Sequence, residues 1–200
     1  MRIIGLTGKA CTGKNVVAKK FEDKGYYVID VDKLGHRALE ENKTIIASTF
    51  GDVLDFDGNV DRKKLGNIVF GSKEKLKILE GITHPGIKKI IIDLIEKESN
   101  DRRRDIIINA ALLERGKLDE LCDCFIYVKS HFLVRYSRTK KRDNRKFVWF
   151  FKRNLSQRHI KISSIKRKKA VYIINNNKGI DEICRQVDNI CDILKERSYN

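Results

Sequence analysis

The chain has little proline and no long apolar run. Pro85 is the sole proline among 200 residues, and no apolar stretch approaches the ~20 residues that cross a bilayer. A signal peptide is not expected, because the first residues, Ile3–Thr7, have the pattern of a buried strand. The sequence therefore predicts a cytoplasmic protein without a membrane partner, and its length suits one domain with a sizeable core.

Paired cysteine spacings are also missing. The five cysteines are odd in number and lack the spacing of metal ligands, which argues against a disulfide framework and favours free thiols in a reducing compartment. Cys122 and Cys124 alternate along an expected strand, so we interpret them as core residues rather than metal ligands. Cys11 falls in a glycine-rich loop, where a small side chain is the simplest explanation.

Acidic residues almost vanish from residues 129–169. This segment holds 16 lysines and arginines and one acidic residue, Asp143, so it carries +15 of the net charge of +16. A concentrated positive field attracts polyanions, which include nucleotide phosphates and nucleic acid. An AT-rich genome would also enrich lysine, but it would not remove acidic residues from one segment only.

The most specific motif is G-x-x-x-x-G-K, formed by Gly8, Gly13 and Lys14. An apolar strand precedes it and an amphipathic helix follows, as a phosphate-binding loop requires. Its backbone N–H groups and the helix N-terminus would face phosphate oxygens, and Lys14 would add positive charge. The residues predicted to bind ATP here are Gly8, Lys9, Ala10, Cys11, Thr12, Gly13, Lys14, Asn15 and Val16.

Strand-like and helical segments alternate along the chain, which predicts an α/β fold with a parallel five-stranded sheet flanked by helices. Such sheets bind ligands at the carboxyl ends of their strands. The sheet and its helices would occupy residues 1–40, 100–130 and 168–200. The expected strands are Ile3–Thr7, Tyr26–Asp30, Asp105–Ala110, Cys124–Lys129 and Val171–Asn175.

Two helical excursions interrupt this pattern. Residues of about 44–99 form an expected substrate lobe, with helices at Asp61–Phe70, Lys73–Ile82 and Gly86–Glu98 and a break at His84-Pro85. Residues of about 131–167 form an expected basic lid, with helices at His131–Lys141 and Arg145–His159. Lids of phosphoryl-transfer enzymes exclude water and bring arginine to the developing charge.

Several polar side chains are candidates for chemistry. Asp32 follows the second strand and is positioned to accept a proton from an attacking hydroxyl; the alternative is an N-cap before a helix at Lys33–Leu39. Arg138 and Arg142 are spaced i, i+4 and share a helix face that can reach a phosphate; the alternative is a solvated cationic face. The preceding acid, Asp30, is either structural or directed at Mg²⁺. His84, before Pro85, is either a substrate ligand or a satisfied histidine at a helix entry.

The ordered set of motifs resembles the dephospho-CoA kinase family over most of the chain. Besides the phosphate loop, the resembling segments are V-I-D-V-D at 28–32, F-G at 50–51, D-G-N-V-D-R at 57–62, I-T-H-P at 82–85, A-A-L-L-E at 110–114, R-T-K-K-R-D at 138–143 and I-I-N-N-N at 173–177. The family has Ser where this chain has Asn15. The Asn15 amide oxygen is a candidate Mg²⁺ ligand, as a neutral carbonyl.

The resemblance implies ATP-dependent phosphorylation of the ribose 3′-hydroxyl of dephospho-CoA, with Mg²⁺. It assigns catalysis to Asp32, as base, and to Lys14, Arg138 and Arg142. The further residues that it implies are Arg62, His84 and Glu114 for the acceptor, beside Asp32, and Asn176 for ATP.

Two other functions remain open at this point. One is another nucleoside or nucleotide kinase, and the other is a catalytically weakened paralogue that binds nucleotides or nucleic acid. We rank nucleic acid low, because the basic residues interleave with an apolar helix face and no stacking platform is evident. A monomer or small homo-oligomer is expected.

Overall fold

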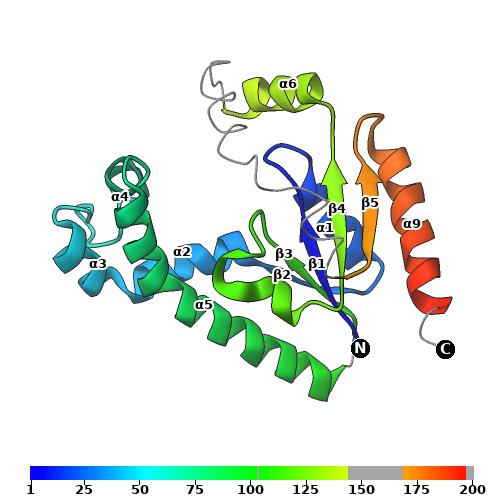
Figure 1. Ribbon diagram of the computed structural model, residues 1–200, viewed down its shortest axis with the longest axis horizontal. Coiled ribbons are helices and arrows are strands. Elements are labelled where there is room, and N and C mark those ends of the chain that lie inside the picture. The colour runs from blue at the N-terminus through cyan, green and yellow to red at the C-terminus, as the bar shows by residue number, and fades with distance from the viewer. Residues whose placement is uncertain (103, 144–168, 197–200) are drawn as a thin grey trace.

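The computed structural model describes residues 1–102, 104–143 and 169–196. Five parallel strands form one sheet in the order β2-β3-β1-β4-β5 (Figure 1). Isoleucine- and valine-rich segments form these strands because both faces of a parallel sheet are covered. The prediction of a parallel five-stranded sheet is confirmed, with strand ends within one residue. The strands are β1 Ile3–Thr7, β2 Tyr27–Asp30, β3 Ile106–Asn109, β4 Cys124–Lys129 and β5 Val171–Asn175.

Helices cover both faces of the sheet (Figure 1). On one face, α1 (Lys14–Asp23) and the closing helix α9 (Ile180–Glu196) enclose a core with the β1 and β4 side chains. On the other face, the long helix α5 (Lys73–Asp101) and the 3-10 segment η1 (Arg115–Leu121) enclose a second core with β3.

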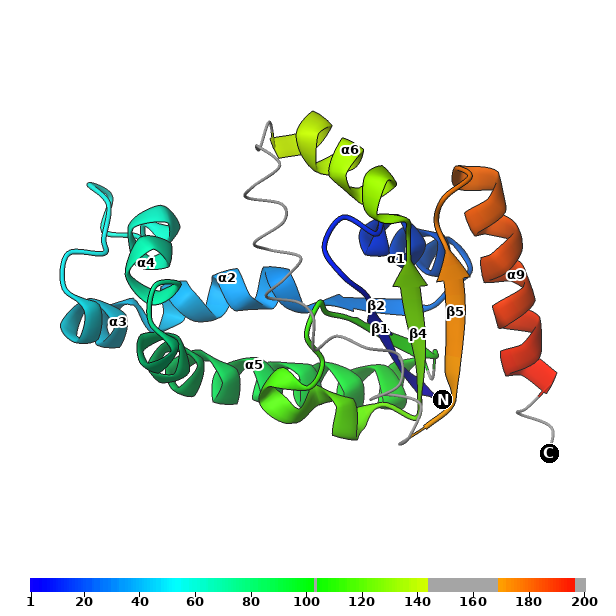
Figure 2. The ribbon, with the colours of Figure 1, turned by 45° about the horizontal axis from the view of Figure 1, so that its top comes forward.

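A helical lobe extends away from the sheet. It contains most of α2 (Val31–Glu41), α3 (Lys43–Phe50) and α4 (Arg62–Val69), together with the first turns of α5 (Figure 2). Asp61 caps α4 by accepting hydrogen bonds from the backbone N–H groups of Lys63 and Lys64 at 2.9 and 3.0 Å. The lobe has a small apolar core of its own, formed by Ile46, Val53, Val60, Leu65 and Val69.

The predicted helix break at His84-Pro85 is wrong. Helix α5 runs without interruption for 29 residues and contains Pro85. A proline inside a helix costs about 3 kcal/mol, but apolar contacts on both sides oppose that cost. Ile82 packs against the lobe core and Ile87 against the sheet core. Pro85 and Gly81 are exposed, so water can hydrate the Gly81 carbonyl that lost its helical partner.

The alternative role of Asp32 as a helix N-cap is also wrong. Helix α2 begins at Val31, two residues earlier than predicted, and Asp30 is its N-cap. The Asp30 carboxylate accepts hydrogen bonds from the backbone N–H groups of Asp32 and Lys33 at 3.1 and 3.3 Å. Of the two roles weighed for Asp30, the structural one is observed. The Asp32 carboxylate is not used by the cap.

The first helix of the expected lid is α6 (Phe132–Asp143). It begins just beyond the carboxyl end of β4 and lies near the phosphate loop (Figures 1 and 2). The second expected lid helix, Arg145–His159, and the Arg142 side chain lie outside the described residues. Within the described ranges, no helix is long and apolar enough to cross a membrane.

Candidate active site

The phosphate loop connects β1 to α1 and depends on its two glycines. Gly8 has a φ of 151°, and a Cβ atom there would lie 2.3 Å from the Val128 carbonyl oxygen. Gly13 has a φ of 89° and is the N-cap of α1. Because no larger residue fits either position without strain, the backbone can turn tightly and aim the α1 N-terminus into the space above the sheet.

Two side chains, one directly after β5 and one in α6, connect the loop to these elements by hydrogen bonds. Asn176, which is 4% exposed, donates through Nδ2 to the Thr12 carbonyl oxygen at 2.8 Å. Arg138 donates through Nη2 to the Asn176 side-chain and backbone oxygens at 2.9 and 3.2 Å. The Thr12 hydroxyl donates to the Lys9 carbonyl oxygen at 2.9 Å. The predicted ATP residue Asn176 thus lies beneath the loop and contacts its backbone.

Arg135 is a site residue that the sequence analysis missed. Its side chain is 5% exposed and donates through Nε to the Ala10 carbonyl oxygen at 2.9 Å. Burial lowers the pKa of Arg135 from its ordinary value, although a guanidinium stays protonated. A fixed positive charge therefore lies directly under the loop. In the sequence, Arg135 precedes Arg138 by three residues, and this i, i+3 spacing was the available signal that both arginines share one helix face.

A cleft of about 520 Å³ opens above the loop. Lys14 and Arg138 supply positive charge on its walls, and Asp32 supplies a carboxylate from α2. Lys14 Nζ donates a hydrogen bond to the Gly8 carbonyl oxygen at 3.0 Å, which connects the two ends of the loop. The cleft therefore combines an anion-binding loop with one acid. Its lining residues are Ala10, Cys11, Gly13, Lys14, Asn15, Val16, Asp32, Ala111, Arg138 and Lys141.

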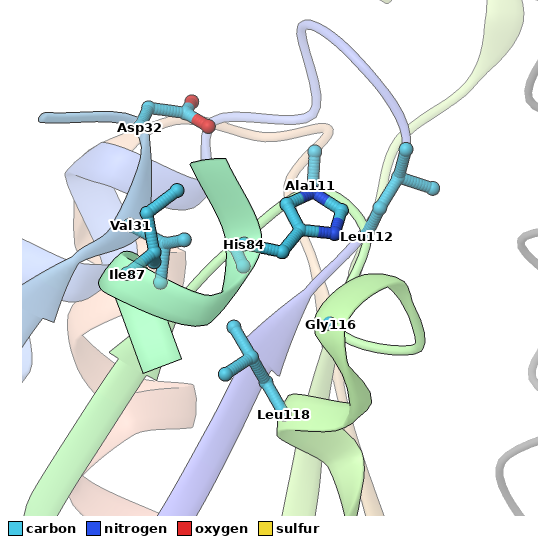
Figure 3. A pocket seen from close by; sticks show the side chains of 9 residues that line it. Val31, Asp32, His84, Ile87, Ala111, Leu112, Gly116 and Leu118 are labelled. Atoms are coloured by element: carbon cyan, nitrogen blue, oxygen red, sulfur yellow. The ribbon is translucent and has the colours of Figure 1, made fainter. Parts of the chain in front are cut away.

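A second, smaller pocket adjoins this cleft (Figure 3). Its volume is about 150 Å³, and its walls are mostly apolar side chains from α2, α5 and the segment after β3. Asp32 and His84 are its polar side chains, and Gly116 lies against the His84 ring. Asp32 and Ala111 line both cavities. The Asp32 residue is therefore shared by the larger cleft and the smaller pocket.

A family model described as dephospho-CoA kinase matches residues 2–182. The chain belongs to the dephospho-CoA kinase family. A dephospho-CoA kinase of Fusobacterium nucleatum is 37% identical over 199 residues, which cover 96% of this chain and 98% of that protein. The match extends over nearly the full length of both proteins, so the whole kinase is shared and not the phosphate loop alone.

Solved structures agree with this assignment. A Thermus thermophilus protein designated TT1252 has a TM-score of 0.81 at 25% identity and covers 98% of this chain and 97% of its own. A dephospho-CoA kinase from Campylobacter jejuni has a TM-score of 0.63 at 26% identity and covers 96% of each chain. The P-loop kinase fold and dephospho-CoA kinase activity predicted from the sequence are confirmed, and the family uses ATP.

The predicted metal ligand of this dephospho-CoA kinase, Asn15, forms a hydrogen bond with a second asparagine side chain. Asn15 lies in the first turn of α1, and its Oδ1 accepts a hydrogen bond from Asn109 Nδ2 at 3.0 Å. Asn109 Oδ1 is buried and has no hydrogen-bond partner among the described residues. A buried oxygen without a partner lowers the stability of the fold by about 1–3 kcal/mol and calls for a functional explanation.

Amide oxygens, such as Oδ1 of Asn15, are hard ligands of the kind that Mg²⁺ prefers. The described residues hold no cluster of three His, Cys, Asp or Glu for a metal.

The remaining residues that were predicted for acceptor binding or catalysis by this dephospho-CoA kinase do not all lie at the two cavities. His84 reaches the smaller pocket, whereas Arg62 and Glu114 are exposed and line neither cavity. Arg62 Nη1 lies 3.0 Å from a ring nitrogen of His36 in the lobe. Arg142 belongs to α6, and its side chain lies outside the described part of the chain.

Proposed function

We propose that phosphoryl transfer takes place where the two cavities meet, with Asp32 as the general base. The observation that carries this proposal is that Asp32 and Ala111 line both cavities. The ribose 3′-hydroxyl of dephospho-CoA would enter from the smaller pocket and ATP from the larger cleft. Asp32 would take the hydroxyl proton as the oxygen attacks the γ-phosphorus, and the bond to ADP would break.

Positive charge around the cleft would stabilise the transferring phosphoryl group. Lys14 would neutralise the β- and γ-phosphate oxygens, and loop N–H groups at the α1 N-terminus would bind the phosphates. Arg138 already lies on the cleft wall, held by Asn176. Arg142 is one helical turn further along α6, so lid closure would add a second guanidinium.

The smaller pocket would hold only part of the acceptor. Its volume of about 150 Å³ suits the reacting ribose, with His84 as a hydrogen-bonding partner. The rest of dephospho-CoA would extend over the surface toward the lobe. We assign Arg62 and Glu114 to this outer part, because both side chains are exposed and therefore accessible to a long ligand.

We further propose that Mg²⁺ accompanies ATP. Asn15 would hold the ion through its amide oxygen, next to the partnerless oxygen of Asn109. When bound, Mg²⁺ neutralises phosphate charge and favours departure of ADP. The protein would contribute to metal binding by fixing the orientation of the Asn15 amide through the hydrogen bond from Asn109.

The proposed setting is a reducing compartment such as the cytoplasm, and the proposed form is a monomer or small homo-oligomer. All five cysteines are free, as expected where thiols stay reduced. Nucleic acid stays an unlikely partner. Arg135, Arg138 and Lys141 are directed at the phosphate loop and its cleft, so a nucleotide accounts for part of the basic segment.

The test of this proposal compares Asp32→Asn with Asp93→Asn, which makes the same change on an exposed position of α5. ADP release dependent on dephospho-CoA is followed with a coupled enzyme, and ATP binding by calorimetry. Asp32→Asn should lower kcat by at least about 100-fold, a usual size for loss of a general base, and leave ATP affinity within about twofold. Near-normal turnover by Asp32→Asn would refute the assignment.

A further inference from the structure

Asn109 ends β3 at the carboxyl edge of the sheet, opposite Leu6 on one side and Asp30 on the other. The residue is 4% exposed, yet within the described part of the chain its side-chain amide makes one hydrogen bond, to Asn15. The oxygen of that amide is buried without a described partner. An unsatisfied oxygen beside a phosphate loop is rarely retained for packing alone, since an apolar residue of the same shape avoids its cost.

The hydrogen bond between the two amides restricts Asn15. Asn15 is exposed in the cleft, and without an anchor its amide would rotate freely about its last torsion. The bond from Asn109 Nδ2 engages one lone pair of Asn15 Oδ1 and leaves the other for a ligand. A ligand of this lone pair must be a cation or a hydrogen-bond donor.

The pair is also electrically neutral. Neither amide can supply the negative charge with which carboxylates hold divalent cations, so phosphate oxygens must supply most of the attraction. A carboxylate at position 109 would differ in two ways. It would add negative charge, and it would accept from Asn15 Nδ2 instead of donating, which would release Asn15 Oδ1 toward the cleft.

We infer that Asn109 is a positioning residue that sets the divalent-cation affinity of the nucleotide site through its hydrogen bond to Asn15. This inference rests on the proposed role of Asn15 as a metal ligand. Asn109 acts on the orientation of the Asn15 amide, and the neutral amide pair makes a weak site that fills when nucleotide phosphates are present. Outer partners of metal ligands typically change affinity by about 10–100-fold.

The experiment uses the full chain with ADP and Mn²⁺ as the probe for Mg²⁺. Electron paramagnetic resonance measures bound Mn²⁺, and calorimetry measures ADP affinity with and without metal. The variants are Asn15→Ala, Asn109→Leu, their double mutant and Asn109→Asp. Asn175→Asp is the matched control, because it makes the same change at the carboxyl end of another strand, β5. Two strands, β1 and β4, lie between β5 and β3, which ends at Asn109.

Asn109→Leu should weaken Mn²⁺ binding to the ADP complex by about tenfold and leave metal-free ADP affinity within about twofold. The double mutant should bind Mn²⁺ no more weakly than Asn15→Ala, because Asn109 acts through Asn15. Asn109→Asp should tighten Mn²⁺ binding, and Asn175→Asp should not. Asn109→Asp is nearly isosteric, so it tests the inference even if Asn109→Leu does not fold.

Unchanged Mn²⁺ affinity in both Asn109 variants would overturn the inference, as would losses that multiply in the double mutant. These outcomes leave the proposed metal role of Asn15 intact, provided that Asn15→Ala weakens Mn²⁺ binding. If Asn15→Ala binds Mn²⁺ as tightly as the wild type, the metal role of Asn15 fails, and the inference about Asn109 fails with it.

Discussion

The Arg135 guanidinium donates a hydrogen bond across 2.9 Å to the carbonyl oxygen of Ala10, in the middle of the phosphate loop. Arg135 belongs to α6, so this bond joins the first helix of the expected lid to the phosphate loop. The Thr139 hydroxyl, one turn along, lies 3.1 Å from Cys11 Sγ in the same loop. Helix α6 therefore contacts the loop at two successive residues, Ala10 and Cys11.

Replacement of Arg135 should destabilise the phosphate loop, because it removes the hydrogen bond to the Ala10 carbonyl oxygen. Arg135→Met keeps much of the side-chain length but removes the charge and leaves the Ala10 oxygen without this donor, at a cost of about 1–3 kcal/mol. We expect a lower melting temperature and ATP affinity about tenfold weaker. Differential scanning fluorimetry and calorimetry measure the two effects. Lys140→Met, an exposed change on the same helix, is the control, and equal losses in both variants would contradict the role of Arg135.

Gly8 cannot carry a side chain. A Cβ atom would lie 2.3 Å from the Val128 backbone oxygen, which cannot move aside without disturbing β4. Gly8→Ala should therefore abolish measurable ATP binding and lower the melting temperature. Gly35→Ala is the control, because nothing lies within 4 Å of the added atom in helix α2. That variant should be stabilised by about 0.5–1 kcal/mol, and normal ATP binding by Gly8→Ala would refute this account of the loop.

His84 should affect the acceptor and not the donor. Its imidazole lines the smaller pocket (Figure 3). The residues of the phosphate loop line the larger cleft instead. His84→Ala should raise the KM for dephospho-CoA by about tenfold, the value of one lost hydrogen bond of about 1.4 kcal/mol. ATP affinity should stay unchanged. His131→Ala, at an exposed position, is the control; a change in ATP affinity alone for His84→Ala would contradict the assignment.

Acid should destabilise the fold through Glu98. Hydrogen bonds from Arg104 at 2.5 and 2.9 Å hold the pKa of Glu98 below its ordinary value of 4.5. The folded state therefore binds this proton less readily than the unfolded state does. The stabilisation is complete above pH 4.5 and is lost as the pH falls from there toward the folded pKa.

Unfolding by urea at pH 7 and at pH 4 measures this dependence. Glu98→Gln should be less stable than the wild type at pH 7, with the difference shrinking at pH 4. Glu96→Gln, an exposed change on the same helix, should leave the dependence as in the wild type. A constant difference between Glu98→Gln and the wild type at both pH values would contradict the pairing.

The sheet and the loop were predictable because local sequence determines them. Strands such as Cys124–Lys129 are short apolar runs that are covered on both faces, and the Gly8–Lys14 spacing permits few other structures. The continuity of α5 through Pro85 was not predictable, because it depends on two cores that lie far apart in the chain. The alternative cap of α2, Asp32, lies two residues after the observed cap, Asp30, because both residue positions carry an aspartate that is an acceptable cap.

The site was predictable where a residue belongs to a recognised motif. Lys14, Asp32 and Arg138 meet in one cleft, as the order of motifs indicated. Arg135 and Asn109 were missed for a physical reason. Their roles arise from contacts with Ala10 and Asn15, which are 125 and 94 positions away in the chain. The i, i+3 spacing from Arg138 was the one sequence signal for Arg135, and no local pattern distinguishes Asn109 from an ordinary strand residue.

The most direct test of dephospho-CoA kinase activity is ADP release with dephospho-CoA as acceptor, measured over a Mg²⁺ and Mn²⁺ titration for the wild type and Asn15→Ser. We expect acceptor-dependent turnover by the wild type, with half-saturation at lower metal concentration in Asn15→Ser. Absence of acceptor-dependent ADP release in both proteins, while ATP still binds, would contradict the account.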